Sequence, residues 1–372
     1  MSGGVDSSLA AVLLQQQGFE VIGVTMHLWD YGTSGGNIGS DTACCSVEAM
    51  SDARTLCQSW NIPHYVLDLR AEFEKEVITD FVSEYLSGRT PNPCVICNQK
   101  MKWEALWTKA KQLGASFLAT GHYAQIETDA KNERYLLKRG TDERKDQSYF
   151  LWILTQHQLQ HTLFPLGSMT KEEVRGLAKK HHLKVAEKGD SQEICFIPDN
   201  NYRRFFQDLA QGNRLKIRSI KEMSTVPAMS TGPIKYRSGE IIGEHSGYPF
   251  YTVGQRKGLG IAAGRPLYVT RIDPSENAVY VGSEEDLYCQ TLSATHLNWI
   301  AIPHLKEPLR CTAKIRYRHH PAKTLVNPII DDRISLHFDE PQRAITPGQS
   351  VVLYNGDVVI GGGIIDNAAT AA

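Results

Sequence analysis

The sequence predicts an α/β fold in which a doubly wound parallel sheet forms the first domain, followed by a small β-rich central domain and a C-terminal β-barrel. Up to about residue 200, short β-branched runs alternate with amphipathic stretches whose apolar residues recur at helical spacing. Beyond residue 200, glycine, proline and short strand-like pieces dominate. From about residue 267, alternating runs separated by turn residues follow one another closely, which is typical of a barrel or sandwich. We therefore expect domains at residues 1–200, 201–266 and 267–372.

The first domain contains three predicted strands at residues 20–26, 64–69 and 115–120. Alternation of strands with helices implies a parallel sheet covered on both faces, and ligands bind such sheets at the carboxyl ends of the strands. Met26 and the pair Gly121-His122 each follow a strand, so we expect them near the ligand. Helices are predicted at residues 46–60, 71–87, 99–113, 146–160 and 170–183, and half of a hairpin at residues 134–139.

The predicted strands of the β-rich part are short and are separated by turn residues. They lie at residues 267–272, 278–281, 311–317, 334–338 and 350–354.

Composition limits the classes of function. The 372 residues are 41% hydrophobic and 22% charged, with a net charge of −1. This near-neutral balance argues against binding of polyanions over the whole surface, so any RNA site must be a local basic patch. The sequence has no apolar run long enough to span a bilayer and no N-terminal signal segment, so we expect a cytoplasmic protein that does not contact membranes. Eight cysteines are too few for a disulfide scaffold in a chain of this length.

The run Ser2-Gly3-Gly4-Val5-Asp6-Ser7-Ser8 leads directly into an apolar stretch that reads as the start of a helix. We call residues 2–8 the opening loop. A glycine turn at a helix N-terminus binds phosphate, because unsatisfied N–H groups and the helix dipole favour negative charge there. The run lacks the Gly-Lys-Ser/Thr ending of a Walker A loop. Such a loop normally follows a buried strand, and only Met1 precedes it here, so we expect a truncated start.

Three cysteines lie in distinctive surroundings. Cys94 and Cys97 form a C-x-x-C motif in a proline-rich loop that opens a helix, and Cys195 follows a polar turn. A thiol at a helix N-terminus beside basic residues has a lowered pKa. Three readings stay open at this point: simple packing, a zinc or iron–sulfur site made of three thiolates, and persulfide chemistry with disulfide resolution. Cys57, Cys289 and Cys311 are interpreted as structural, and Cys44-Cys45 lies in a glycine-rich loop.

Taken together, the motifs resemble those of the tRNA-specific 2-thiouridylases, and the opening loop resembles the PP-loop of ATP pyrophosphatases. The resemblance covers essentially the whole chain, in order. It is carried by residues 2–8, Met26-His27-Leu28-Trp29, residues 92–98, Thr120-Gly121-His122-Tyr123, residues 145–149, residues 191–196, residues 254–260, Arg316-Tyr317-Arg318 and Thr346-Pro347-Gly348-Gln349.

The resemblance implies a role for each matching residue. It implies that Cys97 is the nucleophile and Cys195 the persulfide carrier. ATP would be bound by Ser2, Gly3, Gly4, Val5, Asp6, Ser7, Ser8, Met26 and Gly121. The target base would face Asn92, Pro93 and Cys94, and the rest of the tRNA would contact His122, Lys145, Asp146, Gln147, Arg316, Tyr317 and Gln349.

The implied reaction is 2-thiolation of the wobble uridine in a tRNA anticodon loop. The base oxygen would attack the α-phosphate of ATP, with Mg²⁺ and the opening loop holding the charge, and sulfur from the Cys195 persulfide would displace AMP. Cys97 would either attack the persulfide and free hydrosulfide, or resolve the resulting link as a Cys97–Cys195 disulfide. A single-stranded loop suits this chemistry because the base must leave its stack. A sulfur-relay protein or cysteine desulfurase would supply the sulfur, and a monomer would suffice.

Cys94 departs from the family pattern, because many members have an aspartate at this position. A thiol can replace a carboxylate as an acid or base at neutral pH only if its pKa is lowered. The change favours an iron–sulfur cluster on Cys94, Cys97 and Cys195 as an alternative.

A basic stretch at residues 310–323 contains no acidic residue and includes Tyr317, which favours an RNA-backbone contact over a solvated strand face. Two rival functions remain: a PP-loop synthetase that adenylates a small molecule, and a catalytically inactive RNA-binding protein.

Overall fold

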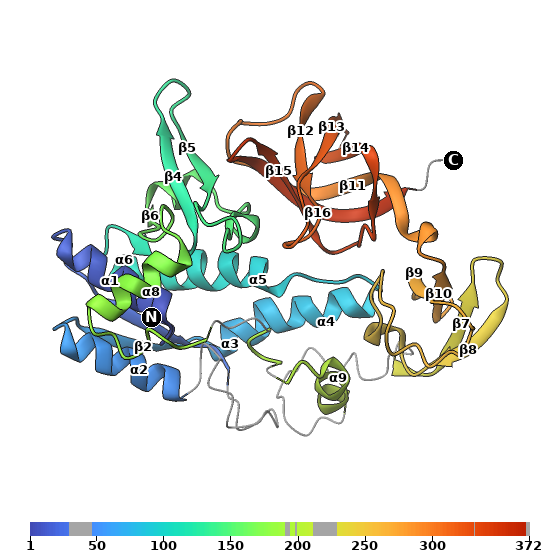
Figure 1. Ribbon diagram of the computed structural model, residues 1–372, viewed down its shortest axis with the longest axis horizontal. Coiled ribbons are helices and arrows are strands. Elements are labelled where there is room, and N and C mark those ends of the chain that lie inside the picture. Colours follow the sequence, from blue (N-terminus) through green and yellow to red (C-terminus); the bar gives the residue numbers. More distant parts are fainter. Residues whose placement is uncertain (30–46, 190–193, 198, 211–228, 331, 370–372) are drawn as a thin grey trace. The chain divides into compact units, whose positions relative to one another are not determined.

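The computed structural model describes residues 1–29, 47–189, 194–197, 199–210, 229–330 and 332–369 (Figure 1). Its contacts divide the chain into two compact units, each with its own hydrophobic core. The first unit comprises residues 1–77, 94–217 and 357–359, and the second comprises residues 78–93, 218–356 and 360–372. The expected domain boundaries after residues 200 and 266 stay predictions.

The parallel strands of the first unit form two separate two-stranded sheets. β1 (Gly23–His27) pairs with β2 (His64–Asp68), and β3 (Leu118–Ala119) pairs with β6 (Thr162–Leu163). The three expected strands are present, the third shortened to two residues, and parallel pairing is confirmed. An antiparallel hairpin of β4 (Ala124–Asp129) and β5 (Arg134–Arg139) confirms the predicted half-hairpin.

Helices of the first unit cover these strands, and α1 packs against α8 (Figure 1). The stretch expected to be helical at residues 146–160 contains only a short 3₁₀ turn at residues 148–150 and a short helix at residues 156–160. The Asp146 carboxylate accepts hydrogen bonds from the Ser148 N–H and hydroxyl, and these bonds compete with those of a helix. The helices are α1 (Val5–Gln16), α2 (Val47–Ser59), α3 (Arg70–Phe73), α5 (Pro93–Ile96), the π-helix η2 (Cys97–Leu106), α6 (Trp107–Gln112), the 3₁₀ turn η3 (Ser148–Phe150), α7 (Gln156–Gln160), α8 (Lys171–Lys180) and α9 (Tyr202–Ala210). The π-turn η1 (Glu74–Ile78) follows α3 directly.

A four-stranded sheet of order β8–β7–β10–β9 forms the first part of the second unit. Its strands are β7 (Gly232–Tyr236), β8 (Ile241–His245), β9 (Tyr268–Asp273) and β10 (Ala278–Gly282), with the 3₁₀ turn η5 (Tyr248–Phe250) between β8 and β9.

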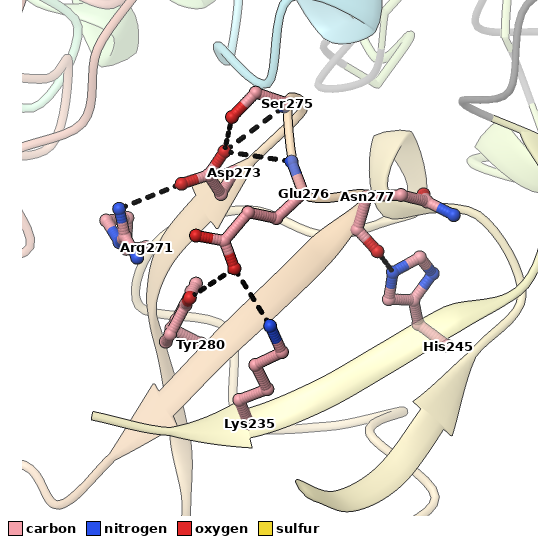
Figure 2. Close-up of polar contacts among 8 residues, drawn as sticks. All are labelled: Lys235, His245, Arg271, Asp273, Ser275, Glu276, Asn277 and Tyr280. Atoms are coloured by element: carbon pink, nitrogen blue, oxygen red, sulfur yellow. Dashed lines mark hydrogen bonds and ion pairs between the residues drawn. The ribbon is translucent and has the colours of Figure 1, made fainter. Parts of the chain in front are cut away.

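Polar contacts fasten the turn between β9 and β10 in this sheet (Figure 2). Asp273 accepts a hydrogen bond of 2.6 Å from the Ser275 hydroxyl. Glu276 accepts from Lys235 of β7 at 2.8 Å and from the Tyr280 hydroxyl at 2.7 Å. The turn is therefore tied to the neighbouring strand by charged side chains rather than by apolar packing.

A β-barrel completes the second unit. Its strands follow the order β11–β14–β13–β12–β15–β16, and pairing of β11 with β16 closes it. Alternate residues of each strand fill the core, as Ile334, Leu336 and Phe338 of β14 do. The strands are β11 (Tyr288–Trp299), β12 (Leu309–Lys314), β13 (Ala322–Ile329), β14 (Arg333–Arg343), β15 (Ser350–Asn355) and β16 (Val358–Ala369), and the 3₁₀ turn η6 (Glu285–Leu287) precedes β11.

The second unit also contains α4 (Thr79–Leu86), with Phe81, Val82 and Tyr85 buried. Asp80 of this helix is half-buried, and burial together with the nearby charge of Glu84 raises its pKa to about 6. The folded state therefore binds a proton at Asp80 more tightly than the unfolded chain does.

We expect Asp80→Asn to stabilise the protein at alkaline pH. Because the folded pKa is raised, the stability linked to Asp80 is complete below about pH 4 and is lost as pH rises through about 6. The variant should therefore melt at a higher temperature than the parent at pH 8, and the two should converge toward pH 4. Calorimetric melting temperatures across this range measure the difference. A constant difference at every pH would contradict the assignment.

Candidate functional site

Glycines shape the opening loop where it enters α1. Gly3 has a φ of +66°, and a Cβ at this position would stand 2.2 Å from the Ala49 carbonyl oxygen, so only glycine fits. Gly4 is the N-cap of α1 and has no side chain to occupy the N–H groups of the first turn. The Ser2 and Ser7 hydroxyls lie 3.0 Å apart across the loop. Because the Ser7 hydroxyl donates to the Gly4 carbonyl at 3.3 Å, the loop offers backbone donors and the Ser2 hydroxyl to an anion.

The only carboxylate of the opening loop, Asp6, is held by two residues from elsewhere in the first unit. Lys171 donates to both Asp6 oxygens at 2.8 Å, and the Tyr123 hydroxyl donates to Oδ1 at 2.8 Å. The Lys171 side chain is only 10% exposed, and its ammonium also lies 5.7 Å from the centre of the Tyr123 ring. Asp6 is therefore neutralised and fixed, so the loop carries no unbalanced negative charge that would repel phosphate.

Gly121 brings the end of β3 against this loop. A Cβ at Gly121 would stand 2.7 Å from the Asp6 carbonyl carbon and 2.8 Å from the Ser7 nitrogen. On the other side, the Thr25 hydroxyl of β1 donates to the Met1 carbonyl at 2.8 Å, and Met26 follows it in the strand. The opening loop therefore lies beside β1, the strand that carries Met26, and against Gly121 after β3. Binding of a ligand by these residues stays a prediction.

His122 follows Gly121 and is neutral. Its pKa lies well below the usual value because the ring is desolvated and Lys102 is close by. The Lys102 ammonium, which can only donate, lies 3.4 Å from Nε2. The ring proton is therefore on Nδ1, which donates to the Thr120 hydroxyl at 2.8 Å. Both ring nitrogens of His122 have partners within the protein.

The segments that carry Cys97 and Cys195 both lie against α3. Cys97 is the first residue of η2, and η2 packs on α3. Beside Cys195, the buried ring of Phe196 lies 5.7 Å from the ring of Phe73 in α3 and 6.4 Å from the ring of Trp29. Cys97 and Cys195 are each half-buried, whereas Cys94 is exposed. Segments about a hundred residues apart in the chain are thus anchored on the same short helix.

Asp146 and Gln147, two of the three residues at 145–147, form hydrogen bonds with backbone groups nearby. The buried Asp146 carboxylate accepts hydrogen bonds from the Gly140 N–H at 3.2 Å and the Ser148 N–H at 3.0 Å. Gln147 exchanges two hydrogen bonds with Tyr123, giving its own N–H and accepting through Oε1. Lys145 is half-buried. The segment therefore supports the loop at His122, next to the opening loop.

The remaining predicted residues lie in the second unit. Arg316 donates from Nη1 to the Arg343 carbonyl at 2.9 Å, and the Lys314 ammonium lies 5.7 Å from the centre of the Tyr317 ring. Gln349 donates from Nε2 to the Thr90 and Pro91 carbonyls at 2.9 and 3.0 Å, directly before Asn92 and Pro93.

Other cysteines are packed rather than reactive. Cys57 is fully buried and its pKa is raised by burial. Burial raises the pKa of Cys311 to about 12, and Cys289 is buried. These placements confirm the structural reading of all three. Cys44-Cys45 and residues 191–193 lie outside the described residues.

Sequence reasoning missed Lys171, Tyr123 and Lys102. A signal for Lys171 does exist: it is the first residue of α8, after the capping box of Thr170 and Glu173. A lysine at a helix N-terminus is disfavoured by the dipole, so its presence there indicates a specific anionic partner. The pairing with Asp6, 165 residues away, is a long-range contact that no local pattern encodes.

Three family models match the chain in succession. A tRNA methyl transferase HUP domain matches residues 1–199, a tRNA methyl transferase PRC-barrel domain matches residues 223–283, and an aminomethyltransferase beta-barrel domain matches residues 289–365.

Curated relatives match over nearly the full length. The chain is 50% identical over 98% of its length, and 96% of the relative, to "tRNA-specific 2-thiouridylase MnmA 1" of Caldanaerobacter subterraneus subsp. tengcongensis. It is 51% identical over 99% of its length, and 94% of the relative, to "tRNA-specific 2-thiouridylase MnmA" of Geotalea uraniireducens. The same name belongs to a Moorella thermoacetica protein that is 50% identical, with 99% of both chains covered.

Among solved structures, the U34-tRNA thiolase NcsA from Methanococcus maripaludis, with its 4Fe–4S cluster, matches with a TM-score of 0.32 and 16% identity over 60% of this chain and 70% of that chain. This likeness is too weak to carry an argument. Within the described residues, no helix is long and apolar enough to cross a membrane.

We expect Lys102→Gln to slow the reaction of Cys97 with iodoacetamide at neutral pH. Lys102 follows Cys97 by five residues, the spacing of one π-helical hydrogen bond, so it lies about one turn further along η2. A cation about one turn from a thiol favours the thiolate that reacts with iodoacetamide, so its loss should slow alkylation at pH 7 by about threefold.

The measurement is the pH profile of Cys97 alkylation, followed by mass spectrometry. Lys100→Gln is the matched control, because Lys100 lies on the same helix but pairs with Glu104 at 3.1 Å. Identical profiles for the parent and Lys102→Gln would contradict this role for Lys102.

Proposed function

The chain belongs to the family of tRNA-specific 2-thiouridylases, and on that premise we propose how its residues perform the reaction. It is an enzyme that transfers sulfur to the 2-position of uridine in tRNA. The observation that best supports the mechanism is that Lys171 neutralises the Asp6 carboxylate of the opening loop. The substrate position is the wobble uridine of the anticodon loop, whose base can leave its stack to enter the site.

ATP is the activating substrate, and the opening loop with Met26 and Gly121 binds it. The N–H groups at the start of α1 and the Ser2 hydroxyl suit a triphosphate. Mg²⁺ would be held chiefly by the phosphates, since this ion keeps several waters and needs few protein carboxylates. Asp6 is the carboxylate of the opening loop. Because Lys171 and Tyr123 already bind it, we give it a supporting role in holding Mg²⁺ rather than a principal one.

The first step forms a bond between the uridine O2 oxygen and the α-phosphorus and breaks the bond to pyrophosphate. The oxygen is thereby converted into part of a good leaving group. Cys195, charged as a persulfide by a sulfur-relay protein or cysteine desulfurase, attacks C2 with its terminal sulfur and expels AMP. The Cys97 thiolate then attacks the Cys195 Sγ, which releases 2-thiouridine and leaves a Cys97–Cys195 disulfide. A thiol reductant closes the cycle.

The proposed tRNA contacts come from both units. Asn92, Pro93 and Cys94 face the base, and His122, Lys145–Gln147, Arg316, Tyr317 and Gln349 support the RNA. In the first unit, neutral His122 and the buried Asp146 are suited to shaping the backbone rather than to pairing with phosphate. The barrel supplies cations at Arg316, Lys314 and the exposed Arg318 for the RNA backbone. Cytoplasmic location and action as a monomer complete the proposal.

An iron–sulfur cluster on Cys94, Cys97 and Cys195 is the alternative cofactor. In the part of the chain that the structure describes, no three His, Cys, Asp or Glu side chains are grouped to hold a metal ion. We therefore take the persulfide route, which uses no metal at the cysteines, as the proposal and keep the cluster as the alternative.

Removal of Cys195 should abolish thiolation while leaving adenylation possible. We expect Cys195→Ser to give no wobble 2-thiouridine, and Cys97→Ser to stop with tRNA joined to Cys195 through a disulfide. Pyrophosphate release in a single turnover should survive in both. Mass spectrometry of the wobble nucleoside and of the intact protein, with ATP and a persulfide donor, measures these products.

Cys311→Ala is the control, because that thiol is buried and its raised pKa of about 12 keeps it protonated. Full thiolation by Cys195→Ser would rule out the proposed carrier.

A further inference from the structure

Two histidines lie one helical turn apart at the end of α7. His157 is the second residue of this helix, and His161, four positions later, is its C-cap. Side chains four apart lie on the same face of a helix, and two histidines with this spacing bind zinc in the H-E-x-x-H motif. The ring centres of His157 and His161 are 4.9 Å apart. We call these two residues the histidine pair.

The short helix that carries the histidine pair is fixed by contacts of its other side chains. Thr155 and Gln158 form a capping box at its start. Gln156 exchanges two hydrogen bonds with the Tyr135 backbone of β5, donating to the carbonyl at 2.9 Å and accepting from the N–H at 2.8 Å. Leu159 is fully buried. The backbone between the two histidines is therefore held by β5 and by the core, and this sets the spacing of the pair.

The ring of His161 has the tautomer and the support of a metal ligand. Its Nδ1 lies 3.1 Å from the Ser116 carbonyl oxygen, which can only accept, so Nδ1 carries the proton and Nε2 the lone pair. Histidines that bind metals almost always donate their other ring N–H in this way. The His161 ring also stacks on Trp107, with ring centres 5.3 Å apart. Because His157 is exposed, solvent reaches the histidine pair.

The separation of the two rings fits a single metal ion bound by both. A zinc–nitrogen bond of about 2.0 Å places the centre of an imidazole ring about 3.1 Å from the ion. Two such rings at a roughly tetrahedral angle have centres about 5 Å apart. The 4.9 Å between the rings of the histidine pair matches this value, so binding requires little rearrangement of the two side chains.

We propose that the histidine pair is a binding site for Zn²⁺ or a chemically similar divalent ion. Imidazole nitrogen suits zinc, copper and nickel, whereas magnesium and calcium prefer oxygen ligands. Among the residues that the structure describes, no third His, Cys, Asp or Glu side chain joins the pair, so water fills the other positions on the ion. Resident zinc centres have three or four protein ligands, so this site with two ligands binds its ion exchangeably.

The place of the histidine pair in the fold indicates a structural role for the ion. His161 lies where β3 and β6 begin, because its carbonyl accepts from the Leu118 N–H at 2.8 Å and Thr162 follows it in the chain. Gly121, which lies against the opening loop, comes after the opposite end of β3. An ion on the histidine pair would therefore fasten the end of α7 beside β6, and it would take no part in the sulfur transfer proposed above.

Histidine labelling with diethyl pyrocarbonate tests the proposal on the whole protein. Mass spectrometry assigns the label to individual histidines, so Zn²⁺ bound at cysteines does not affect the readout. As Zn²⁺ is added, labelling of His157 and His161 should fall along one saturation curve, by at least about threefold, because a coordinated nitrogen cannot be acylated. Mg²⁺ should leave both rates unchanged. Unchanged labelling of either histidine in Zn²⁺, or two different curves, would overturn the proposal.

His181 is the matched internal control for this labelling. It is the C-cap of α8 and its ring lies 5.7 Å from the ring of Trp60, but the residue four positions earlier is Leu177. Zn²⁺ should therefore leave the labelling of His181 unchanged. Equal protection of His181 and of the histidine pair would show a general effect of the ion on histidines and would rule out the site.

The variant His157→Gln separates a shared ion from two independent contacts. It replaces an exposed side chain and leaves the His161 ring in place, and we expect Zn²⁺ to protect His161 no longer. His181→Gln should keep the protection of both histidines, and thermal melting establishes that the two variants are folded. Protection of His161 that persists in His157→Gln would contradict a shared ion. None of these readouts depends on thiolation, so they test the site whatever the outcome for the proposed function.

Discussion

The ion pair between Asp6 and Lys171 is the interaction on which the nucleotide site depends. Lys171 contacts both carboxylate oxygens at 2.8 Å while its side chain is only 10% exposed, and Tyr123 adds a hydroxyl donor. The pair joins the start of α1 to the start of α8. Because Lys171 balances the Asp6 charge, the N–H groups of the first turn of α1 lie beside no uncompensated carboxylate of the opening loop. Removing one partner would leave the other as an uncompensated, partly buried charge, which destabilises far more than loss of an exposed pair. A Cβ at Gly121 would clash with the Asp6 backbone, so the opening loop packs closely against the residues that follow β3.

The segments of Cys97 and Cys195, the proposed nucleophile and persulfide carrier, are held in the same unit by a different kind of contact. Aromatic packing of Phe196 on Phe73 anchors the Cys195 segment at α3, where η2 with Cys97 also packs. Lys102 then links η2 to His122, which adjoins Gly121 and the opening loop. A series of described contacts therefore runs from the opening loop to the helix that carries Cys97, the proposed nucleophile.

Much of the fold and of the candidate site could be predicted from the sequence, and the features that could not be predicted have physical reasons. Local patterns predicted the strands, the amphipathic helices, the opening loop and the buried Cys57, because periodicity and glycine placement act over a few residues. The prediction of a helix at residues 146–160 was wrong over much of its length, because the Asp146 carboxylate binds the Ser148 donors and competes with helical hydrogen bonding. The contacts of Lys171 and Lys102, and the hydrogen bonds of Gln349 to the Thr90 and Pro91 carbonyls, depend on residues far apart in the chain, which no local pattern relates. The roles of Cys97 and Cys195 came from family resemblance, not from spacing.

We propose that the opening loop directs the α-phosphorus of ATP, rather than its γ-phosphorus, to the uridine oxygen. The most direct measurement uses tRNA whose wobble uridine carries an isotopic oxygen label at O2. After one turnover with ATP and a persulfide donor, mass spectrometry locates the label among the small products. We expect the label in AMP and none in pyrophosphate. Label in inorganic phosphate, with ADP as the nucleotide product, would contradict attack at the α-phosphorus.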